Sequence, residues 1–341
     1  MRIRCEGGTL IYSNGARKSS ISARVQRVYG MPRLQRGRLH ERARRWEDAF
    51  GRDDLFGVIQ ESRRERVLDW VDGLGLPAGS RTLEIGPGAG VMTVALAERG
   101  FAVHAADTTP RLLDVARDRV AAAGVASRVR LLLADAQRLP FADHRFNLVV
   151  ALGVLPWLPS ASPAVAEIAR VLRPGGYLVL NADNSGRLAL LLDPRHNPAL
   201  APARLAARSL LHSGGMPRPA EQATVAPHRL AEFDAILKTA GLELLKRSTF
   251  GFGPFTMFGL PVTSARAGLR LNARLQRLAD QGMPGFRSAG AQYLVLARAP
   301  AADPARPPDG HTPPPDGPAP PRDGPNPPPD GPTPPSGDQM P

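Results

Sequence analysis

Three glycines at alternate positions follow a short apolar run, and this feature constrains the fold of the chain more than any other. Residues 82–85 predict a buried strand, and residues 91–99 predict a helix. Between them lie Gly86, Gly88 and Gly90. Because glycine has no Cβ, the backbone of such a turn can approach a ligand closely, and the helix that follows presents free N–H groups. The sequence therefore predicts a strand–turn–helix unit that binds a ligand through its backbone.

Composition narrows the classes of partner that the chain can have. Its 341 residues carry a formal net charge of +13, but only three of the basic residues are lysines. No lysine-rich tract or basic strand interleaved with aromatic residues is present, so we expect solvated surface arginines, a GC-rich bacterial source and no specific nucleic-acid partner. Cys5 is the only cysteine, which excludes an intrachain disulfide and a cysteine metal cluster, and we expect no metal. No apolar stretch has the length of a membrane span and the N-terminus has no apolar signal region, so we expect a cytoplasmic protein.

Downstream of the glycines, short apolar runs alternate with helical patterns. Further strands are predicted at 102–106, 129–134, 147–152, 177–181, 242–249 and 292–298, and helices at 110–123, 163–172 and 227–240. Such alternation predicts an α/β fold, in which a mostly parallel sheet is covered by helices on both faces. The carboxyl ends of the parallel strands then lie at one edge of the sheet, where ligands bind.

The chain divides into four segments by composition and pattern. They are a poorly ordered N-terminal segment (1–35), a helical cap (36–78), the α/β domain (79–300) and a disordered, proline-rich tail (301–341). Two long insertions interrupt the α/β domain, at 183–226 and 250–291. Because both begin at the ligand edge of the predicted sheet, we expect them to form a lid over the substrate together with the cap.

The segment 83–90 resembles motif I of the class I S-adenosylmethionine (SAM)-dependent methyltransferases, an acidic residue followed by x-Gly-x-Gly-x-Gly, with Glu84 as the acid. Its spacing differs from the dinucleotide-binding fingerprint, which has two residues before the last glycine, so an NAD-dependent oxidoreductase ranks last among the alternatives. Residues 134–136 resemble the adenine site of the family, and residues 168–176 resemble the signature before its fifth strand. The resemblance covers residues 60–183 and extends more weakly to residue 298.

The resemblance implies both a fold and a cofactor site. The fold is a Rossmann-like, seven-stranded, mostly parallel sheet with helices on both faces, a final antiparallel strand, an N-terminal helical lid and two long insertions over the carboxyl edge. Glu84 would lie near the ammonium of SAM, Asp107 would accept hydrogen bonds from both ribose hydroxyls, and Asp135 would accept one from the adenine amino group. The full set of expected SAM-binding residues is Glu84, Gly86, Pro87, Gly88, Gly90, Asp107, Thr108, Asp135, Ala136, Leu152 and Gly153.

The residues that would act on the acceptor are less well defined. Several relatives in the family have histidines in the loop after the fourth strand, and here the loop 153–157 has none. The candidate general bases are Asp183, His196, His212 and His228. A lone histidine, however, is more often a surface or capping residue. The aromatic side chains that would line an apolar acceptor site are Trp157, Phe250, Phe252 and Phe255, and packing of the lid onto the domain is the alternative.

We expect an enzyme that transfers a methyl group from SAM to a small-molecule or lipid-like acceptor, at oxygen. A SAM-binding or scaffold protein without turnover is one alternative, because the loop after the fourth strand lacks a histidine. An RNA methyltransferase is another, because it would explain the charge. Residues 264–281 predict a basic amphipathic helix, which either contacts an anionic membrane surface or serves as a lid helix with solvated arginines. The sequence leaves the oligomeric state open.

Overall fold

The computed structural model describes residues 3–6, 9–12, 54–195, 197–206, 228–258 and 260–301. All of them belong to one structural unit, which extends to Asp303. Several sequence predictions fall outside these residues: the bases His196 and His212, the first part of the helical cap (36–53), the second half of the first insertion (207–226) and the tail from residue 302 onward. Within the described ranges, no helix is both long and apolar enough to cross a membrane.

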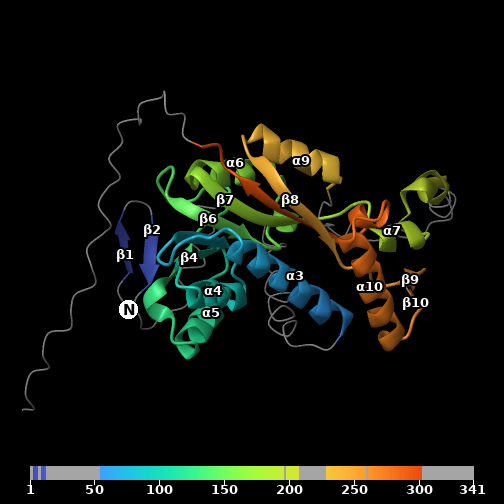
Figure 1. The fold of residues 1–341 in the computed structure, drawn as a ribbon, viewed down its shortest axis with the longest axis horizontal. Helices are drawn as coiled ribbons and strands as arrows, with labels where there is room; N and C mark the ends of the chain where they lie inside the picture. The colour runs from blue at the N-terminus through green and yellow to red at the C-terminus, as the bar shows by residue number, and fades with distance from the viewer. Residues whose placement is uncertain are drawn as a thin grey trace, which may run out of the picture. The chain divides into compact units, whose positions relative to one another are not determined.

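A seven-stranded sheet forms the centre of the fold (Figure 1). Its strands in chain order are β3 (Arg81–Ile85), β4 (Ala102–Asp107), β5 (Val129–Leu133), β6 (Phe146–Ala151), β7 (Leu172–Asp183), β8 (Glu243–Phe250) and β11 (Gln292–Arg298). Their spatial order is β5-β4-β3-β6-β7-β11-β8, and β11 runs antiparallel to both of its neighbours. The other neighbouring strands pair in parallel. The predicted mostly parallel sheet with a final antiparallel strand is therefore confirmed.

Helices cover both faces of the sheet, as predicted (Figure 1). On one face lie α3 (Leu55–Asp72), α4 (Val91–Glu98) and α5 (Pro110–Ala122), and on the other lie α6 (Ser162–Val171) and α9 (Leu230–Thr239). Side chains alternate between the two faces along each strand. Leu83 and Ile85 of β3 pack in the core cluster that includes Ile168 of α6 and Phe233 of α9. Glu84, between them, therefore points to the face that α3 and α4 cover.

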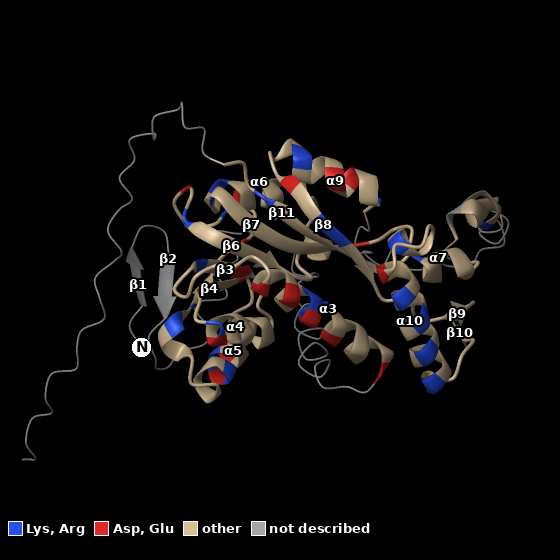
Figure 2. Cartoon of the chain, in the orientation of Figure 1, with Lys and Arg blue, Asp and Glu red and all other residues tan. Residues whose placement is uncertain are grey.

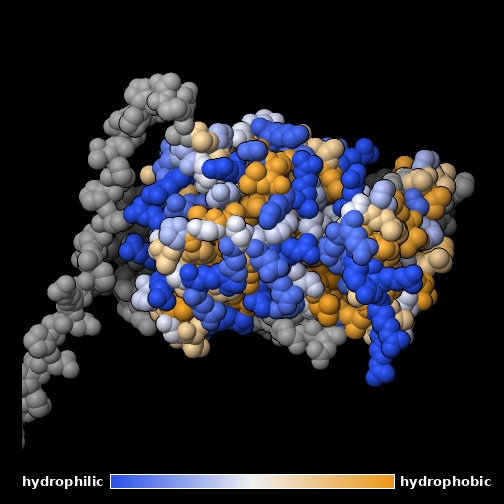
Figure 3. Space-filling view, in the orientation of Figure 1, coloured by the Kyte–Doolittle hydropathy of each residue, from blue (hydrophilic) through white to orange (hydrophobic). Residues whose placement is uncertain are grey.

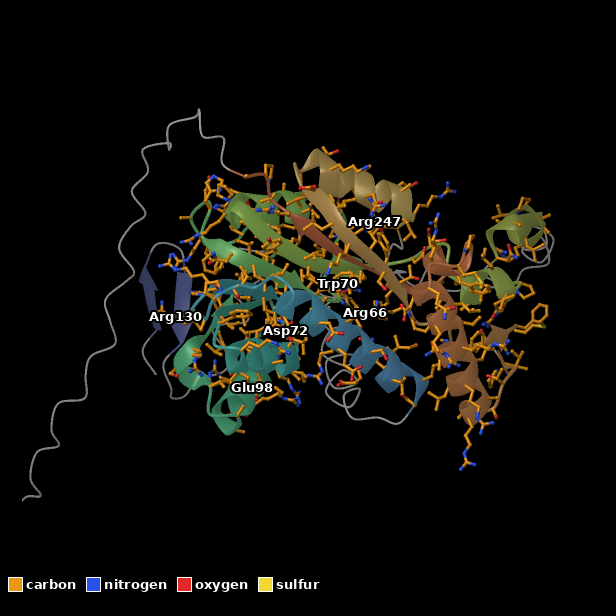
Figure 4. All side chains as sticks on the ribbon, in the orientation of Figure 1. Arg66, Trp70, Asp72, Glu98, Arg130 and Arg247 are labelled. Atoms are coloured by element: carbon orange, nitrogen blue, oxygen red, sulfur yellow. The ribbon has the colours of Figure 1, made fainter. Side chains whose placement is uncertain are left out.

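Helix α3 is held against the sheet by both apolar and polar contacts. Figure 4 labels Arg66 and Trp70, which lie one helical turn apart on this helix. Trp70 is 7% exposed and packs in the core. Arg66 donates hydrogen bonds to Asp280 at 3.1 Å and to Ser248 at 3.3 Å, so it joins α3 to β8 and to α10 (Ala265–Asp280). The described part of the predicted helical cap is therefore one helix that is anchored near the last strands of the sheet.

The two long insertions contact each other beyond the carboxyl edge of the sheet. The first contains α7 (Leu188–Leu192) and the short helix η3 (Pro198–Leu200), and the second contains β9 (Thr256–Met257), β10 (Leu260–Pro261), α10 and η4 (Phe286–Ser288). The side-chain amide of Asn184 donates to the backbone oxygens of Ser288 at 2.7 Å and Gly290 at 2.8 Å. Thr256 donates to Asp193 at 3.1 Å. These contacts tie the insertions together, and their role as a lid over the substrate stays a prediction.

Two local features differ from the sequence predictions. The predicted turn 173–176 lies inside β7, because pairing with β6 passes directly from Leu172 to Tyr177 and leaves the residues between them as a bulge. Helix α9 begins at Leu230, with Arg229 as its N-cap, rather than at residue 227. His228 and Arg229, which were predicted to lie in its first turn, precede the helix instead, and His228 pairs with Asn184 of the first insertion.

Three short elements complete the described structure. The helix η1 (Ala126–Arg128) precedes β5, and η2 (Leu155–Trp157) follows β6. A hairpin of β1 (Ile3–Glu6) and β2 (Thr9–Tyr12) pairs antiparallel within the segment 1–35, which we expected to be poorly ordered. The rest of that segment lies outside the described residues.

Candidate functional site

Left-handed backbone conformations shape the turn between β3 and α4. The φ angles of Gly86, Gly88 and Gly90 are +69°, +54° and +79°, in a region that residues with a Cβ rarely adopt. The Gly86 N–H donates to the backbone oxygen of Ala106 at 2.8 Å and ties the turn to the end of β4. Gly90 is the N-cap of α4, and its N–H donates to the backbone oxygen of Pro87 at 2.8 Å. The turn is thus fixed by one hydrogen bond to the neighbouring strand and by one within the turn itself.

Two of these glycines are also required by close packing, whereas the third faces open space. A Cβ at Gly86 would lie 2.6 Å from Cγ2 of Val154, and a Cβ at Gly90 would lie 3.0 Å from Cα of Ala116. A Cβ at Gly88 would have no heavy atom within 4 Å. The turn therefore packs against the fold through Gly86 and Gly90 and leaves the backbone at Gly88 open to a ligand.

Glu84, near the end of β3, is a buried carboxyl group. It is 4% exposed and accepts a hydrogen bond from the hydroxyl of Thr93 on α4. Burial raises the pKa of Glu84 to about 7; the Thr93 hydrogen bond lowers it in part, and the charge of Asp107 raises it further. A cation beside Glu84 would favour the ionised form, so this position suits a positively charged group of a ligand.

Asp107, at the end of β4, is a second buried carboxyl group and links two turns. Its Oδ1 accepts a hydrogen bond from the Thr109 N–H at 2.8 Å. Burial raises the pKa of Asp107 to about 6, whereas hydrogen bonds from Thr109 and from the backbone of Thr108 and Gly88 lower it in part. The carboxylate therefore lies beside the open backbone of Gly88, where it can accept hydrogen bonds from the hydroxyls of a ligand.

The predicted adenine segment follows β5, the next strand of the sheet. Asp135 is 9% exposed, and its Oδ1 accepts a hydrogen bond from the Gln137 N–H at 2.9 Å, so one carboxylate oxygen holds the local turn. Ala136 is buried beside it. Because β5, β4 and β3 are adjacent, the structure brings Asp135, Asp107 and Glu84 to the carboxyl ends of three neighbouring strands, as the sequence predicts.

The loop after β6 is fixed by a side chain that the sequence analysis missed. Leu152 and Gly153 begin this loop, and Gly153 has a φ of +70°. The Gly153 N–H donates to Oδ1 of Asn181, on β7, at 2.6 Å. Asn181 is fully buried, and its Nδ2 has no hydrogen-bond partner in the described part of the chain. One polar residue inside the apolar run 177–181 is the sequence signal that points to it.

Two of the candidate bases come together at the end of β7. The His228 N–H donates to the backbone oxygen of Asp183 at 2.9 Å. Burial raises the pKa of the Asp183 carboxyl, and the nearby charges of Arg187, Arg63 and His228 lower it in part. Asp183 is therefore a partly buried acid at the ligand edge of the sheet, and His228 is its neighbour rather than a helix cap.

The aromatic candidates have packing roles in this structure. Phe250, Phe252 and Phe255 are 2%, 1% and 5% exposed. Phe250 packs in the core with the guanidinium of Arg66 5.3 Å from its ring centroid, and Phe252 and Phe255 pack together among lid residues. Trp157, at the end of η2, is partly exposed. Packing in the core and between the insertions accounts for the contacts of the three phenylalanines, and contact of these four side chains with an acceptor stays a prediction.

The sequence analysis also missed two polar side chains of α3 that are buried at this edge. Gln60 is 1% exposed and Arg63 is 5% exposed. They lie three residues apart, and hence on one face of the helix, between the buried apolar residues Ile59 and Val67. The sequence of this helix gives no signal that identifies them, because their burial results from the packing of α3.

Replacement of Gly86 by alanine is expected to weaken cofactor binding, and Gly124 offers a matched control. Both glycines have a φ of +69°, so alanine at either position costs about 1–2 kcal/mol of folding free energy. A Cβ at Gly86 meets the Val154 side chain, whereas a Cβ at Gly124 meets no heavy atom within 4 Å. We expect Gly86→Ala to lower the affinity for S-adenosylhomocysteine by about tenfold or more, measured by isothermal titration calorimetry. Gly124→Ala should keep the wild-type affinity, and equal losses in both variants would contradict a specific role for Gly86.

The raised pKa values of Glu84 and Asp107 predict a stability that falls with pH. In the unfolded chain both carboxyl groups ionise at about pH 4, but in the ligand-free native protein their pKa values are about 7 and about 6. Between these values the native state holds protons that the unfolded state has lost. The free energy of unfolding contributed by these groups therefore falls as the pH rises from about 4 to about 7.

Cofactor affinity should change in the opposite direction, because the ionised carboxylates accept hydrogen bonds and attract cations. Urea unfolding and titration with S-adenosylhomocysteine between about pH 5 and pH 8 measure both trends. The Asp107→Asn variant serves as the reference, since it has no titrating group at this position. The free energy of unfolding of wild type is compared with that of Asp107→Asn at each pH. If the difference, wild type minus variant, rose with pH, the assignment of a raised pKa to Asp107 would be wrong.

The chain matches known proteins over this same region. Residues 83–180 match the model of a family described as methyltransferase domain. The chain is 35% identical over 233 residues to "Methyltransferase GfsG" of Streptomyces halstedii, and the match covers 63% of this chain and 81% of that protein. It is 34% identical over 146 residues to a malonyl-[acyl-carrier protein] O-methyltransferase of Serratia marcescens, and 34% identical over 128 residues to a phosphatidylethanolamine N-methyltransferase of Cereibacter sphaeroides.

The last two matches cover 42% and 38% of this chain and span 53% and 61% of those relatives, so they concern little more than half of each protein. The first spans most of its relative and extends beyond the matched domain. The topology of the sheet, the open glycine turn and the carboxylates after β3, β4 and β5 agree with this likeness. The chain is therefore an enzyme of the class I SAM-dependent methyltransferase family, and its cofactor is SAM.

Proposed function

We propose that this enzyme transfers the methyl group of SAM to an oxygen atom of a small-molecule or lipid-like acceptor. In this proposal Glu84 contacts the ammonium of SAM, Asp107 the ribose hydroxyls, and Asp135 with the Ala136 amide the adenine. The open backbone of Gly88 beside the carboxylate of Asp107 supports the assignment, since a ligand there meets no side chain. Bound SAM supplies a methyl group on a positively charged sulfur, so the protein contributes mainly by orienting the acceptor.

The observation that carries the choice of oxygen is the position of Asp183. It ends β7, two strands away from β3, at the edge of the sheet where the glycine turn lies. A hydroxyl acceptor needs a base near neutral pH, and burial raises the pKa of Asp183 toward that range. Among the relatives, one is named as an O-methyltransferase and one as a lipid N-methyltransferase, which agrees in kind with a small or lipid-like acceptor.

Transfer of a ¹³C-labelled methyl group to a cell extract, separated into small-molecule, lipid and RNA fractions, tests this function directly. The chemical shift of the transferred carbon distinguishes an O-methyl from an N-methyl or C-methyl product. We expect an O-methyl product in the small-molecule or lipid fraction, and a rate about 10²–10⁴-fold lower in the Asp183→Asn variant with unchanged affinity for S-adenosylhomocysteine. Asp234→Asn is the control, since Asp234 is a carboxylate on α9, on the other face of the sheet, bonded to the Tyr293 hydroxyl at 2.9 Å.

Each alternative predicts a different result of the same experiment. A SAM-binding protein without turnover would bind the cofactor and label nothing. An RNA methyltransferase would label the RNA fraction. Equal rates in Asp183→Asn and wild type would remove Asp183 as the base and, with it, the main support for oxygen as the acceptor atom.

We also propose that this cytoplasmic enzyme contacts the anionic inner face of the membrane through α10. Ser264 caps this helix, Gln281 follows it, and its exposed arginines form a row (Figure 2). These arginines are Arg266, Arg270, Arg274 and Arg277. Exposed apolar side chains lie just before the helix, at Met257 (49%), Phe258 (63%), Leu260 (71%) and Val262 (58%). Figure 3 shows hydrophilic side chains along the α10 region with hydrophobic ones beside them, a combination that suits an anionic lipid surface.

Sedimentation with lipid vesicles tests the membrane contact. We expect binding to vesicles that contain 30% anionic lipid and not to neutral vesicles, with about 30-fold weaker binding for Arg270→Gln/Arg274→Gln, at about 1 kcal/mol per charge. Arg111→Gln/Arg119→Gln on α5 removes the same charge elsewhere and is the matched control. Equal weakening of the two double variants would assign the binding to net charge alone.

A further inference from the structure

Gln60 and Arg63, on the inward face of α3, are buried polar side chains with unused hydrogen-bonding groups. Neither Oε1 nor Nε2 of Gln60 has a hydrogen-bond partner in the described structure, and Nε of Arg63 has none either. Arg63 makes one long hydrogen bond, from Nη1 to Oε1 of Gln292 at 3.3 Å. Burying such groups without hydrogen-bond partners is unfavourable, and the folded protein has already met the cost of removing water from them. A ligand that binds there would therefore gain affinity by supplying the missing hydrogen bonds.

Arg63 also has no dedicated counterion in the described part of the chain. The ion pairs found among the described residues do not include it. Burial lowers its pKa to about 10, and the charge of Asp183 raises it in part, so Arg63 remains charged at neutral pH. Asp183 is itself near Arg187 and His228. With His228 neutral, Arg63 and Arg187 carry two positive charges and Asp183 carries one negative charge. An anion can balance the one positive charge that is left.

The register of the sheet places this pair on the acceptor side of the cofactor site. Asp183 of β7 and Gln292 of β11 are directly paired. By the alternation of side chains along each strand, both lie on the face of the sheet that packs against α3. The carboxylates assigned to the cofactor follow β3, β4 and β5, and β6 separates these strands from β7. At about 4.8 Å per strand, β11 lies about 14 Å from β3. Asn181 adds a buried Nδ2 without a described partner on the same face of β7.

We propose that Gln60 and Arg63 form a subsite for a carboxylate of the acceptor. Planar guanidinium and amide groups match the geometry of a carboxylate, and both present donors that the protein leaves free. The acceptor is then an organic acid, held by its carboxylate under α3 with the rest of the molecule directed toward the loop after β6. This subsite rests on the proposed function, methyl transfer to a small-molecule acceptor.

Titration of the full-length protein, saturated with S-adenosylhomocysteine, tests the subsite. The probes are acetate, benzoate and decanoate, each compared with its primary amide, which has the same shape and no charge. We expect wild type to bind at least one acid about tenfold or more tightly than its amide, and Arg63→Met to reduce that preference below about threefold. Arg64→Met is the matched control, because Arg64 is the next residue of α3, faces outward with a side chain 28% exposed, and pairs with Glu61. It should keep the wild-type preference.

A second titration separates the two possible sources of a carboxylate. S-adenosylhomocysteine has a methionine-derived carboxylate, and methylthioadenosine lacks it. We expect Arg63→Met to bind both nucleosides with wild-type affinity. A loss of about tenfold or more for S-adenosylhomocysteine alone would assign the pair to the cofactor and overturn the proposal. No acid preference in wild type, or equal loss in Arg64→Met, would also overturn it.

Thermal unfolding decides whether Arg63 is instead a structural residue. Because its buried charge has no ion pair with any described residue, Arg63→Met is expected to unfold no lower than Arg64→Met in the absence of ligand. A midpoint lower by about 5 °C or more would show that the protein needs Arg63 for stability and would overturn the subsite. If methyl transfer to every extract fraction fails while the acid preference holds, the proposed function fails and the subsite stands.

Discussion

The close contact between Gly86 and Val154 is the constraint on which the arrangement of the site depends. It holds the turn after β3 against the loop after β6, while the Gly86 N–H binds the end of β4. The same loop is fixed to β7 by the hydrogen bond from Gly153 to Asn181. Four neighbouring strands are thus linked at their carboxyl ends by contacts made between loops. The cofactor side and the acceptor side of the site are therefore held relative to each other by contacts between the backbone of Gly86 and Gly153 and the side chains of Val154 and Asn181.

Much of the fold could be predicted from the sequence because the strands of this sheet are short apolar runs between turn residues. The carboxylates at the carboxyl ends of β3, β4 and β5 could be predicted for the same reason, since each lies within two residues of the end of its strand. The bulge at 173–176 could not, because a bulge and a turn have the same local sequence and differ only in what pairs beyond them. The start of α9 was placed too early because His228 is held by a contact with Asn184, far away in the sequence.

The acceptor side of the site was harder to predict, and the reason is physical. Gln60 and Arg63 have ordinary surroundings in the sequence of a charged helix, and their burial results from packing of α3 near β11. Asn181 depends in the same way on a loop from another strand. The phenylalanines of the second insertion show the opposite case. Phe252 and Phe255 are conspicuous in the sequence, but in the structure they pack among residues of the two insertions. Local pattern therefore identifies the cofactor residues and gives little information on residues whose environment comes from distant segments.

The position of β11, next to the edge strand β8, has a consequence for how the protein is made. Because β11 lies between β7 and β8, neither of those strands can complete its pairing until residues 292–298 have been synthesised. Until then both strands present free backbone groups along an apolar edge, which is a template for association with other chains. This side of the sheet therefore closes late in synthesis. A chain without residues 292–298 exposes the edge of β7 and both edges of β8, whereas the complete sheet exposes one edge of β8 on this side. Protection of nascent chains during this interval, by chaperones or by rapid completion, is a requirement that this topology imposes on the cell.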